Sequence, residues 1–595
     1  MPLPPATSPL FGRSQALALP HAMWAALLLS LALLLGGCGG GGKADATPPV
    51  APPTDSGEPL SGPGTGTMNA AAQRAAVRLA DQASFGATEP LLQDIYSRGA
   101  PEWLATQMAA TGSRYTSGRG DAVHINDNGN FCLGREDTCW RDWFSSEPLL
   151  WDFYRNALTQ PDQLRQRVAF ALAQIVVVSN LEVGGTYGWR QYHNTLLDNA
   201  FGNYRDVLRR VVLSPLMGEY LDHVNNDRVS PNENFARELL QLFAVGTCLL
   251  NSDGTLKGGN CQATYDNQIV RDYAYALTGW TYPAGGSTVW GCWPQGANCP
   301  YLGGDMVARS ALHDDKPRTL LGGRTLPASR TPQQALDAVL DSLLAHPNMA
   351  PFIGRQLIQH LVKSNPSDAY VQRVATAFAS GRHGTARSFG SGQPGDLAAT
   401  VAAVLLDTEA RAGKASQPAE KMREPVLATT GMLRAMNGRT DGEALGWWWG
   451  GLLRQHVFRS PSVFNYYPPN FPVPGTAMVG PAFGIYNPNT ALAMINFANQ
   501  LIYWGGAQPA ADIPGATGTA INLTGFEADA DDAAKLTDRF INLALGGRFS
   551  ATARQHVIDA VSAFTPTAHP DNWRSERTRT AAYLVLTSPA YLVLQ

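Results

Sequence analysis

The sequence predicts a mostly α-helical protein, a large helical body of two lobes with long irregular, disulfide-stapled loops and minor β-hairpins. Three observations support this fold class. Apolar residues recur at the i, i+3, i+4 spacing of amphipathic helices over most of the chain after residue 70. The chain lacks the alternation of strand and helix patterns that indicates a parallel sheet. Stretches rich in Gly, Asn and Pro separate the helical segments, and all but one of the 7 cysteines lie within them.

The composition is that of a globular protein. The 595 residues allow several domains. With 44% hydrophobic and 16% charged residues, the chain can bury sizeable cores. Because the net charge is −3 and no long basic run occurs, we expect no nucleic-acid partner.

The N-terminus has the features of a secretion signal. An apolar run from Met23 to Leu35 is too short to span a bilayer comfortably, and it ends in Leu-Gly-Gly-Cys at Cys38. This ending looks like a bacterial lipobox, so residues 1–37 are predicted to be a lipoprotein signal peptide and Cys38 the lipidated residue. Gly39, in place of Asp, favours the outer membrane, with the protein facing the periplasm or the surface. An ordinary signal peptide or a short buried helix is the alternative.

The composition of the chain after the signal peptide predicts its division into a tether, two helical lobes and a loop between them. Residues 38–69 are rich in Gly, Pro, Thr and Ala, which predicts a flexible tether. We expect an N-terminal helical lobe over 70–280, a loop insertion over 281–324 and a C-terminal helical lobe over 325–595. No internal repeat is visible.

The other cysteines form three local pairs. An oxidising compartment favours disulfides between neighbours, the simplest connectivity. A zinc site is the alternative, but no Cys-x-x-Cys occurs, and we expect no metal site. The predicted disulfide cysteines are Cys132 and Cys139, Cys248 and Cys261, and Cys292 and Cys299.

Helices are expected wherever the periodicity meets capping residues. Gly86 ends the first helix and Thr88 caps the next, and a later one is capped by Asp396. The other predicted helices include 164–178, 204–213, 217–223, 265–280, two within 331–362, 396–406, 423–436, 491–504, 532–545, 551–564 and 578–595.

The clearest helix signal runs from Ser230 to Gly246. Ser230 and Glu233 match a reciprocal capping box, and Gly246 is a plausible stop. Its polar side chains fall on one narrow stripe: Asn234, Arg237, Glu238 and Gln241. This stripe is either a solvated face with an i,i+4 ion pair, or the lining of a cleft in which Arg237 and Glu238 need partners.

Two further segments carry chemistry-bearing residues. The segment 281–324 is expected to be a protruding loop with short strands, and its turn His313-Asp314-Asp315-Lys316 offers a general base or metal ligands. An exposed charged turn is the alternative. Three consecutive tryptophans, 447–449, follow a predicted capping box of Thr440 and Glu443, and at least one must point away from the core.

Aromatic residues also crowd the proline-rich segment 460–472. Its extended aromatic residues, including Tyr466 and Tyr467, suit either stacking on sugars and peptides or stapling a loop to the core. No phosphate-binding loop, zinc-protease helix or serine-hydrolase elbow is present. The sequence therefore names no cofactor.

Several of these segments resemble a bacterial family catalogued as domain of unknown function 1800. The resemblance rests on Arg78-Leu79 with Phe85-Gly86, on Pro231 to Phe243, and on Arg271 to Trp280. It continues through His313-Asp314, Leu321-Gly322, His346-Pro347 with Phe352-Ile353, Lys421-x-Arg-Glu-Pro-Val and Arg459-Ser-Pro-Ser-Val-Phe. Gln241 stands where an acidic residue is commoner in the family. The resemblance implies a large secreted bacterial protein and a possible secreted partner of the alkaline phosphatase and sulfatase superfamily, but no established activity.

Two functions follow as hypotheses, and the sequence leaves open whether the protein is an enzyme. The first is an interaction or assembly lipoprotein for an envelope glycan, peptide or protein. Its candidate binding residues are Asn234, Gln241, Trp448, Tyr466 and Tyr467. The alternative is an envelope hydrolase acting on a polysaccharide or another anionic substrate. In it Glu238 is the acid/base and Arg237 holds the substrate, while His313 and Asp314 assist. Convergence of these four side chains in one pocket would support the enzyme.

Overall fold

The computed structural model describes residue 64 and residues 66–120, 130–286, 291–384, 387–412 and 421–594. The predicted signal peptide, Cys38 and all of the tether before residue 64 lie outside the described residues. The predicted domain boundaries stay a prediction. Among the helices that the structure describes, none is long and apolar enough to cross a bilayer.

The first half of the described chain is helical, as the periodicity predicts. Thr88 caps α3 by accepting a hydrogen bond from the Leu91 backbone N–H, as predicted. The helices are α2 (Ala70–Ala83), α3 (Glu89–Arg98), α4 (Ala100–Ala109), α5 (Cys139–Phe144), α6 (Glu147–Thr159), α7 (Gln163–Ala173), α8 (Thr186–Asp198), α9 (Tyr204–Leu213), α10 (Pro215–Tyr220), α11 (Asn234–Gln241) and α12 (Asn267–Ala276).

The middle of the chain holds short strands and single helical turns. Strands β1 (Trp280–Thr281) and β2 (Val307–Ala308) pair antiparallel, as do β3 (Arg318–Leu320) and β4 (Arg324–Leu326). The 3₁₀ turns are η2 (Lys257–Gly259), η3 (Ser310–Leu312) and η4 (Leu321–Gly323). The short strands predicted for this region are confirmed, and the protrusion of the loop stays a prediction.

The second half returns to helices. Asp396 caps α16 through the Ala399 N–H, and Thr331 with Gln334 forms a complete capping box on α13. The elements are α13 (Pro332–Leu344), α14 (Met349–Leu361), α15 (Asp368–Ser380), α16 (Leu397–Leu406), α17 (Thr408–Arg411), β5 (Lys421–Met422), α18 (Pro425–Ala435), the π-helix η5 (Ala444–Gly450), η6 (Pro481–Gly484), α19 (Pro488–Ile502), α20 (Thr524–Glu527), α21 (Ala533–Leu545), α22 (Ala551–Ser562), α23 (Trp573–Leu586), α24 (Pro589–Leu592) and β6 (Val593–Leu594).

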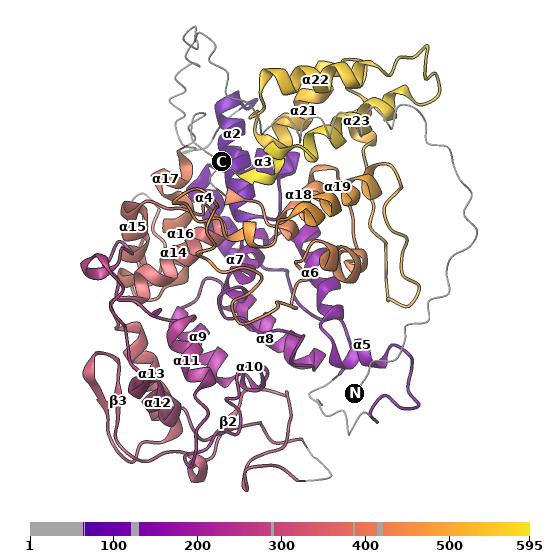
Figure 1. The fold of residues 1–595 in the computed structure, drawn as a ribbon. Helices are drawn as coiled ribbons and strands as arrows, with labels where there is room; N and C mark the ends of the chain where they lie inside the picture. The colour runs from indigo at the N-terminus through magenta and orange to yellow at the C-terminus, as the bar shows by residue number, and fades with distance from the viewer. Residues whose placement is uncertain are drawn as a thin grey trace. The chain divides into compact units, whose positions relative to one another are not determined.

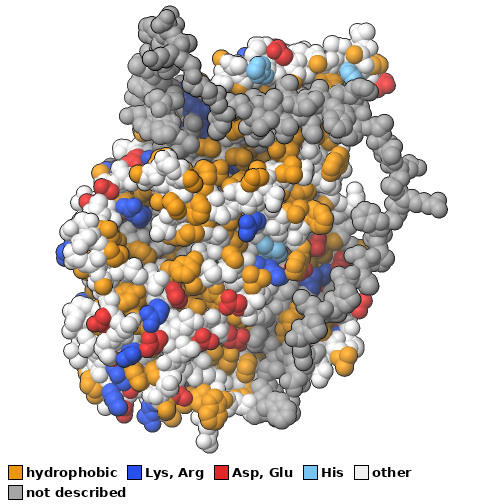
Figure 2. Space-filling model, in the orientation of Figure 1, with side chains coloured by type: hydrophobic (Ala, Val, Ile, Leu, Met, Phe, Trp, Pro, Cys, Tyr) orange, Lys and Arg blue, Asp and Glu red, His pale blue; other side chains and the backbone are white. Residues whose placement is uncertain are grey.

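One continuous hydrophobic core connects elements from both ends of the chain. Its buried residues extend from Ala76 in α2 to Tyr591 in α24. Figure 1 shows the C-terminal α21, α22 and α23 next to the N-terminal α2 and α3, and α2 packs directly on α21. On the face shown in Figure 2, the described basic and acidic side chains are interspersed. The mostly α fold is confirmed.

A buried ion pair ties α2 to the segment before α18. Arg423 Nη1 and Nη2 donate to the two carboxylate oxygens of Asp81 at 3.0 and 3.2 Å. The turn after α2 also lies close against α18: a β-carbon on Gly86 would lie 2.5 Å from the Gly431 Cα, so this contact requires glycine. Two of the segments that carry the family resemblance are therefore in contact.

The predicted capping box on α11 is wrong. The helix begins at Asn234, four residues after Ser230, and Glu233 at its N-cap makes no side-chain capping bond. Asn226 and Asn232 instead exchange two hydrogen bonds, and the Arg228 N–H donates to the Leu312 carbonyl. These long-range bonds hold the segment before α11 in a non-helical path.

All three predicted disulfide pairings are confirmed. Cys132 bonds to Cys139, Cys248 to Cys261, and Cys292 to Cys299. Within the second loop, antiparallel bridges join Cys248 to Ala263 and Leu250 to Leu256, in agreement with the minor β-hairpins of the predicted fold class.

Candidate functional site

The polar stripe of α11 divides between the surface and the interior. Arg237 is half-exposed and bonds to Glu233 at 3.1 Å, the i,i+4 pair that the solvated-face interpretation expects. Glu238 is buried, and its Oε2 has no hydrogen-bond partner. Burial raises the pKa of Glu238, against the opposing charge of Arg237. The hydroxyl of Tyr265, which interacts electrostatically with Glu238, is also unpartnered.

His313 and Asp314 belong to a different network. His313 Nδ1 donates to the Thr278 carbonyl at 2.8 Å, and its Nε2 is buried without a partner. Asp314 accepts two bonds from Arg318, at 2.7 and 2.9 Å. This carboxylate is therefore committed to a neighbouring guanidinium. His313 and Asp314 are buried, while Asp315 and Lys316 of the same turn are exposed.

The two pairs share no direct polar contact in the described chain, since no hydrogen bond or ion pair joins Arg237 or Glu238 to His313 or Asp314. Of the two other stripe residues, Asn234 donates to Asp222 at 3.1 Å and Gln241 is half-buried. Their roles in catalysis or binding stay a prediction.

A second group of side chains gathers where the π-helix η5 meets the N-terminus of α6. The Trp447 and Trp448 side chains are 50% and 67% exposed, while Trp449 is buried, which confirms that the run could not lie wholly in the core. The capping box predicted for Thr440 and Glu443 does not form, since the Thr440 hydroxyl pairs with Thr519. Glu443 is thereby free to face α6.

Two carboxylates lie close to each other where Trp447 meets α6. Glu147, the first residue of α6, accepts a hydrogen bond from the Trp447 indole N–H. Glu443 accepts one from the Trp151 indole at 2.9 Å. Burial, together with the charge of the nearby Glu443, raises the pKa of Glu147 to about 7. We call Glu147, Glu443, Trp447 and Trp448 the tryptophan–carboxylate site.

Basic groups border this site. The Arg459 guanidinium lies over the Trp447 ring, 4.4 Å from its centroid, and the His456 ring is 5.4 Å from it. Burial lowers the pKa of His456 to about 4, and its Nε2 has no partner. The site thus combines aromatic surface, paired carboxylates and an unpaired ring nitrogen.

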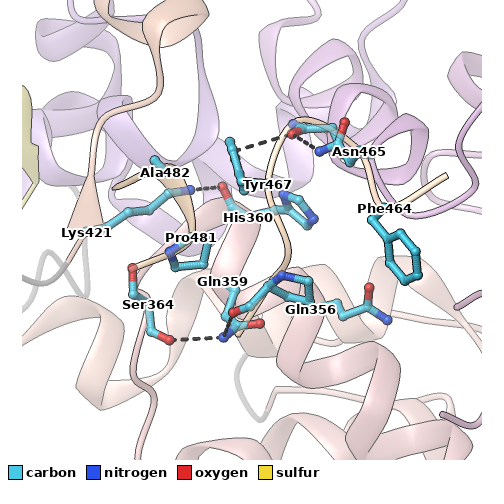
Figure 3. Close-up of a pocket in the computed structure, with 12 residues that line it drawn as sticks. Gln356, Gln359, His360, Ser364, Lys421, Phe464, Asn465, Tyr467, Pro481 and Ala482 are labelled. Carbon is cyan, nitrogen blue, oxygen red and sulfur yellow. Dashed lines mark hydrogen bonds between the residues drawn. The ribbon is translucent and has the colours of Figure 1, made fainter. Parts of the chain in front are cut away.

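A small polar cavity forms a separate site between α14, β5 and the 464–482 segment. Its volume is about 40 Å³, which can hold a few water molecules. Figure 3 shows Lys421, His360 and Tyr467 around it, with Gln356 and Phe464 on the other side. The amide nitrogens of Gln174 and Gln356 are buried there without partners. We call this the Lys421 cavity.

Charged side chains support one wall of the Lys421 cavity. The Lys421 Nζ and Arg167 Nη2 both donate to the His360 carbonyl near the C-terminal end of α14. Glu424 accepts from Tyr467 at 2.7 Å and from Gln455 at 2.6 Å. Burial would raise the pKa of Glu424, but the charges of Lys421 and Arg167 outweigh it and lower the pKa.

Two of the predicted binding residues fall in these two groups of side chains: Trp448 is exposed next to Trp447, and Tyr467 lines the Lys421 cavity. Their role in binding stays a prediction. Tyr466 instead bonds to the His456 carbonyl at 2.6 Å. Glu147 and Glu443 were missed, because neither sits in a recognisable catalytic motif. The Lys421-x-Arg-Glu-Pro segment was noted only as part of the family resemblance.

Comparisons with known proteins identify one family. A family model described as a protein of unknown function, DUF1800, matches residues 78–593. No curated protein and no solved structure matches the chain. The predicted family resemblance is confirmed over nearly the whole chain.

Proposed function

We propose, from the premise that this chain belongs to the DUF1800 family of proteins of unknown function, that it is a cell-envelope lipoprotein that binds an envelope glycan. The binding surface is the tryptophan–carboxylate site. The observation that carries the proposal is the exposed Trp447 indole, which donates its N–H to Glu147. The exposed Trp448 follows it in the chain, and the charge of the nearby Glu443, which accepts from the buried Trp151, acts on Glu147.

The chemistry of this surface suits a saccharide. Sugar rings present apolar C–H faces that pack on indole rings, while their hydroxyl groups donate hydrogen bonds to carboxylates. An exposed apolar patch without acceptors would favour a protein partner instead. Glu147 and Glu443 have unused lone pairs beyond their single indole bonds, so they can accept hydroxyl protons.

Substitution of the exposed indole tests the binding. We expect Trp448→Ala to weaken the binding of isolated envelope polysaccharide by about 30-fold or more, since central aromatic residues contribute about 2 kcal/mol or more to an interface. Calorimetry with solubilised peptidoglycan and with lipopolysaccharide-derived polysaccharide measures this loss. Trp504→Ala is the matched control, because Trp504 is 61% exposed and lies outside the site. Equal losses in both variants, or no binding by the unaltered protein, would refute the proposal.

One observation favours hydrolysis of the bound glycan as a second candidate function. A carboxyl group with a pKa near 7 is about half protonated at neutral pH, and a second carboxylate lies close to it. Glycosidases use such a pair, with one member as the general acid and the other as base or nucleophile. Glu147 would then protonate the leaving oxygen, and Glu443 would activate water or attack the sugar.

For this second function, Glu147→Gln is expected to lower turnover at least about 100-fold while glycan binding remains, because the amide cannot donate the acid proton. The rate for the unaltered protein should fall as the pH rises above about 7, where Glu147 loses its proton. Release of reducing ends from the same polysaccharides measures the rate. A variant that is as active as the parent protein excludes Glu147 as the acid.

The membrane anchor is tested apart from the site. Cys38→Ser should move the protein from the membrane fraction to the soluble fraction, because acyl chains supply the predicted attachment. Metabolic labelling with radioactive palmitate, followed by fractionation, measures both effects. Membrane retention of the unlabelled variant would contradict the lipoprotein assignment. The predicted secreted partner of the alkaline phosphatase and sulfatase superfamily stays a prediction.

A further inference from the structure

The Lys421 cavity contains an amine in an unusual setting. Lys421 is buried and its Nζ makes one hydrogen bond, to the His360 carbonyl. A carbonyl only accepts hydrogen bonds, so the lone pair of a neutral amine would stay available. The side chain lines the cavity, as Figure 3 shows.

The surroundings favour the neutral form of this amine. Burial, opposed by the charge of Glu424 and assisted by the charge of Arg167, lowers the pKa of Lys421 to about 7. A large fraction of the side chain is therefore unprotonated at neutral pH. Desolvated lysines next to a second cation are the ones that act as nucleophiles toward carbonyl carbon.

The opposite side of the cavity offers donors to a ligand. The side-chain nitrogens of Gln174 and Gln356 are buried without partners, and Gln174 is 7% exposed. Unpaired amide N–H groups of this kind suit carbonyl or carboxylate oxygens. The small volume limits the ligand to a few non-hydrogen atoms.

We propose that Lys421 forms a Schiff base with a small carbonyl compound, of the class of short aldehydes and 2-oxo acids. Gln174 and Gln356 hold the oxygen atoms of the ligand opposite the amine. This site is independent of the glycan site, with which it shares no residue.

The step balances without an oxidant or a metal. The amine nitrogen bonds to the carbonyl carbon, and the carbonyl oxygen takes up a proton. The C–O bond of the resulting carbinolamine then breaks, and the nitrogen gives up its remaining proton, so that one water leaves and a C=N bond forms. Both protons of the departing water come from the amine nitrogen and pass to the oxygen through solvent, since the Tyr467 hydroxyl donates its own proton to Glu424.

Lys421 and Arg167 both donate hydrogen bonds to the His360 carbonyl near the C-terminal end of α14. The alternative to the proposal is that Lys421 serves only this structural role, in which case it would not react with carbonyl compounds. Reductive trapping separates the two roles. The complete protein is incubated at pH 7 with pyruvate or acetaldehyde and cyanoborohydride, and modified lysines are mapped by mass spectrometry.

We expect Lys421 to be labelled at least about tenfold faster than Lys535, whose pKa is raised by its bond to Asp529 and whose side chain is exposed. Labelling of Lys421 should increase with pH up to about 7 and then level off. Gln356→Met should slow labelling by pyruvate about tenfold, but labelling by acetaldehyde much less, because only pyruvate carries a carboxylate.

Labelling of exposed lysines without modification of Lys421 would overturn the proposal. So would equal effects of Gln356→Met on both probes, which would remove the role of the amide in holding a carboxylate. Lys421→Met should abolish the adduct, but the mapping on the unaltered protein decides the question even if that variant does not fold. Intact glycan binding alongside failed trapping would leave the proposed function in place.

Discussion

Asp81→Ala is expected to lower the free energy of unfolding by about 3–5 kcal/mol, because it leaves the Arg423 guanidinium buried without its counter-charge. The two side chains are only 5% and 4% exposed, and both carboxylate oxygens accept bonds from Arg423. The arginine is held further by the Tyr591 carbonyl and ring. It therefore cannot turn toward water when the carboxylate is removed.

Urea denaturation followed by circular dichroism measures this loss. The double variant Asp81→Leu with Arg423→Met should recover much of the stability, since an apolar pair of similar volume carries no desolvation cost. Asp94→Ala, which breaks the exposed pair with Arg98, is the control and should cost less than about 1 kcal/mol. A change of similar size in Asp81→Ala and Asp94→Ala would contradict the argument.

The second large effect is a loss of stability in mild acid. Burial lowers the pKa of His193, His223 and His360 to about 3, and that of His456 to about 4. In the unfolded chain these groups bind protons near pH 6.5, while the folded protein does not. Their contribution to stability is full above pH 6.5 and is lost as the pH falls toward 3, by about 1.4 kcal/mol per pH unit for each histidine.

Two carboxyl groups act in the opposite direction. The pKa of Glu147 is raised to about 7 and that of Glu238 is also raised, so the folded state binds their protons more tightly. Their contribution is present at low pH and is lost as the pH rises. Four histidines against Glu147 leave about three protons, or roughly 4 kcal/mol per pH unit between pH 5 and 6, and the raised pKa of Glu238 makes this slope smaller.

Urea midpoints at pH 7, 6 and 5 measure the slope. His193→Phe, which retains an aromatic ring among Trp189, Tyr115 and Phe458, should reduce the slope by about 1.4 kcal/mol per pH unit. The same measurement on His556→Gln, a change at an exposed position, is the control. If the free energy of unfolding does not vary between pH 7 and 5, these histidines bind protons equally well in the folded and unfolded states. They would then be accessible to water, contrary to the prediction.

Helix positions could be predicted well from the sequence because their signals are local. The Thr331 capping box, the Thr88 cap and the Asp396 cap all form, since each joins residues within one turn. The disulfide pairs could be predicted for the same reason, because each closes a short loop. The boxes at Ser230 and Thr440 fail where long-range bonds to Leu312 and Thr519 compete for the same segments.

The candidate sites could not be predicted in this way. Glu147 and Trp447 lie 300 residues apart in the chain, and no periodicity links them. Lys421 meets Arg167 only because α7 packs on α14, whose His360 carbonyl both side chains share. Conversely, Arg237 and Glu238 are neighbours in sequence, yet one faces solvent and the other the interior.

The sequence alone was enough to establish the helical class, the disulfide pairs and the family. Each of these depends on residues that are close together in the chain, as in a helix cap, a short disulfide loop or a continuous family motif. Packing between helices that are distant in the chain decided which polar groups share a cavity. The same packing decided which carboxyl groups have a raised or lowered pKa. Burial and charge proximity are properties of the folded protein, and they set the electrostatics on which any activity here rests.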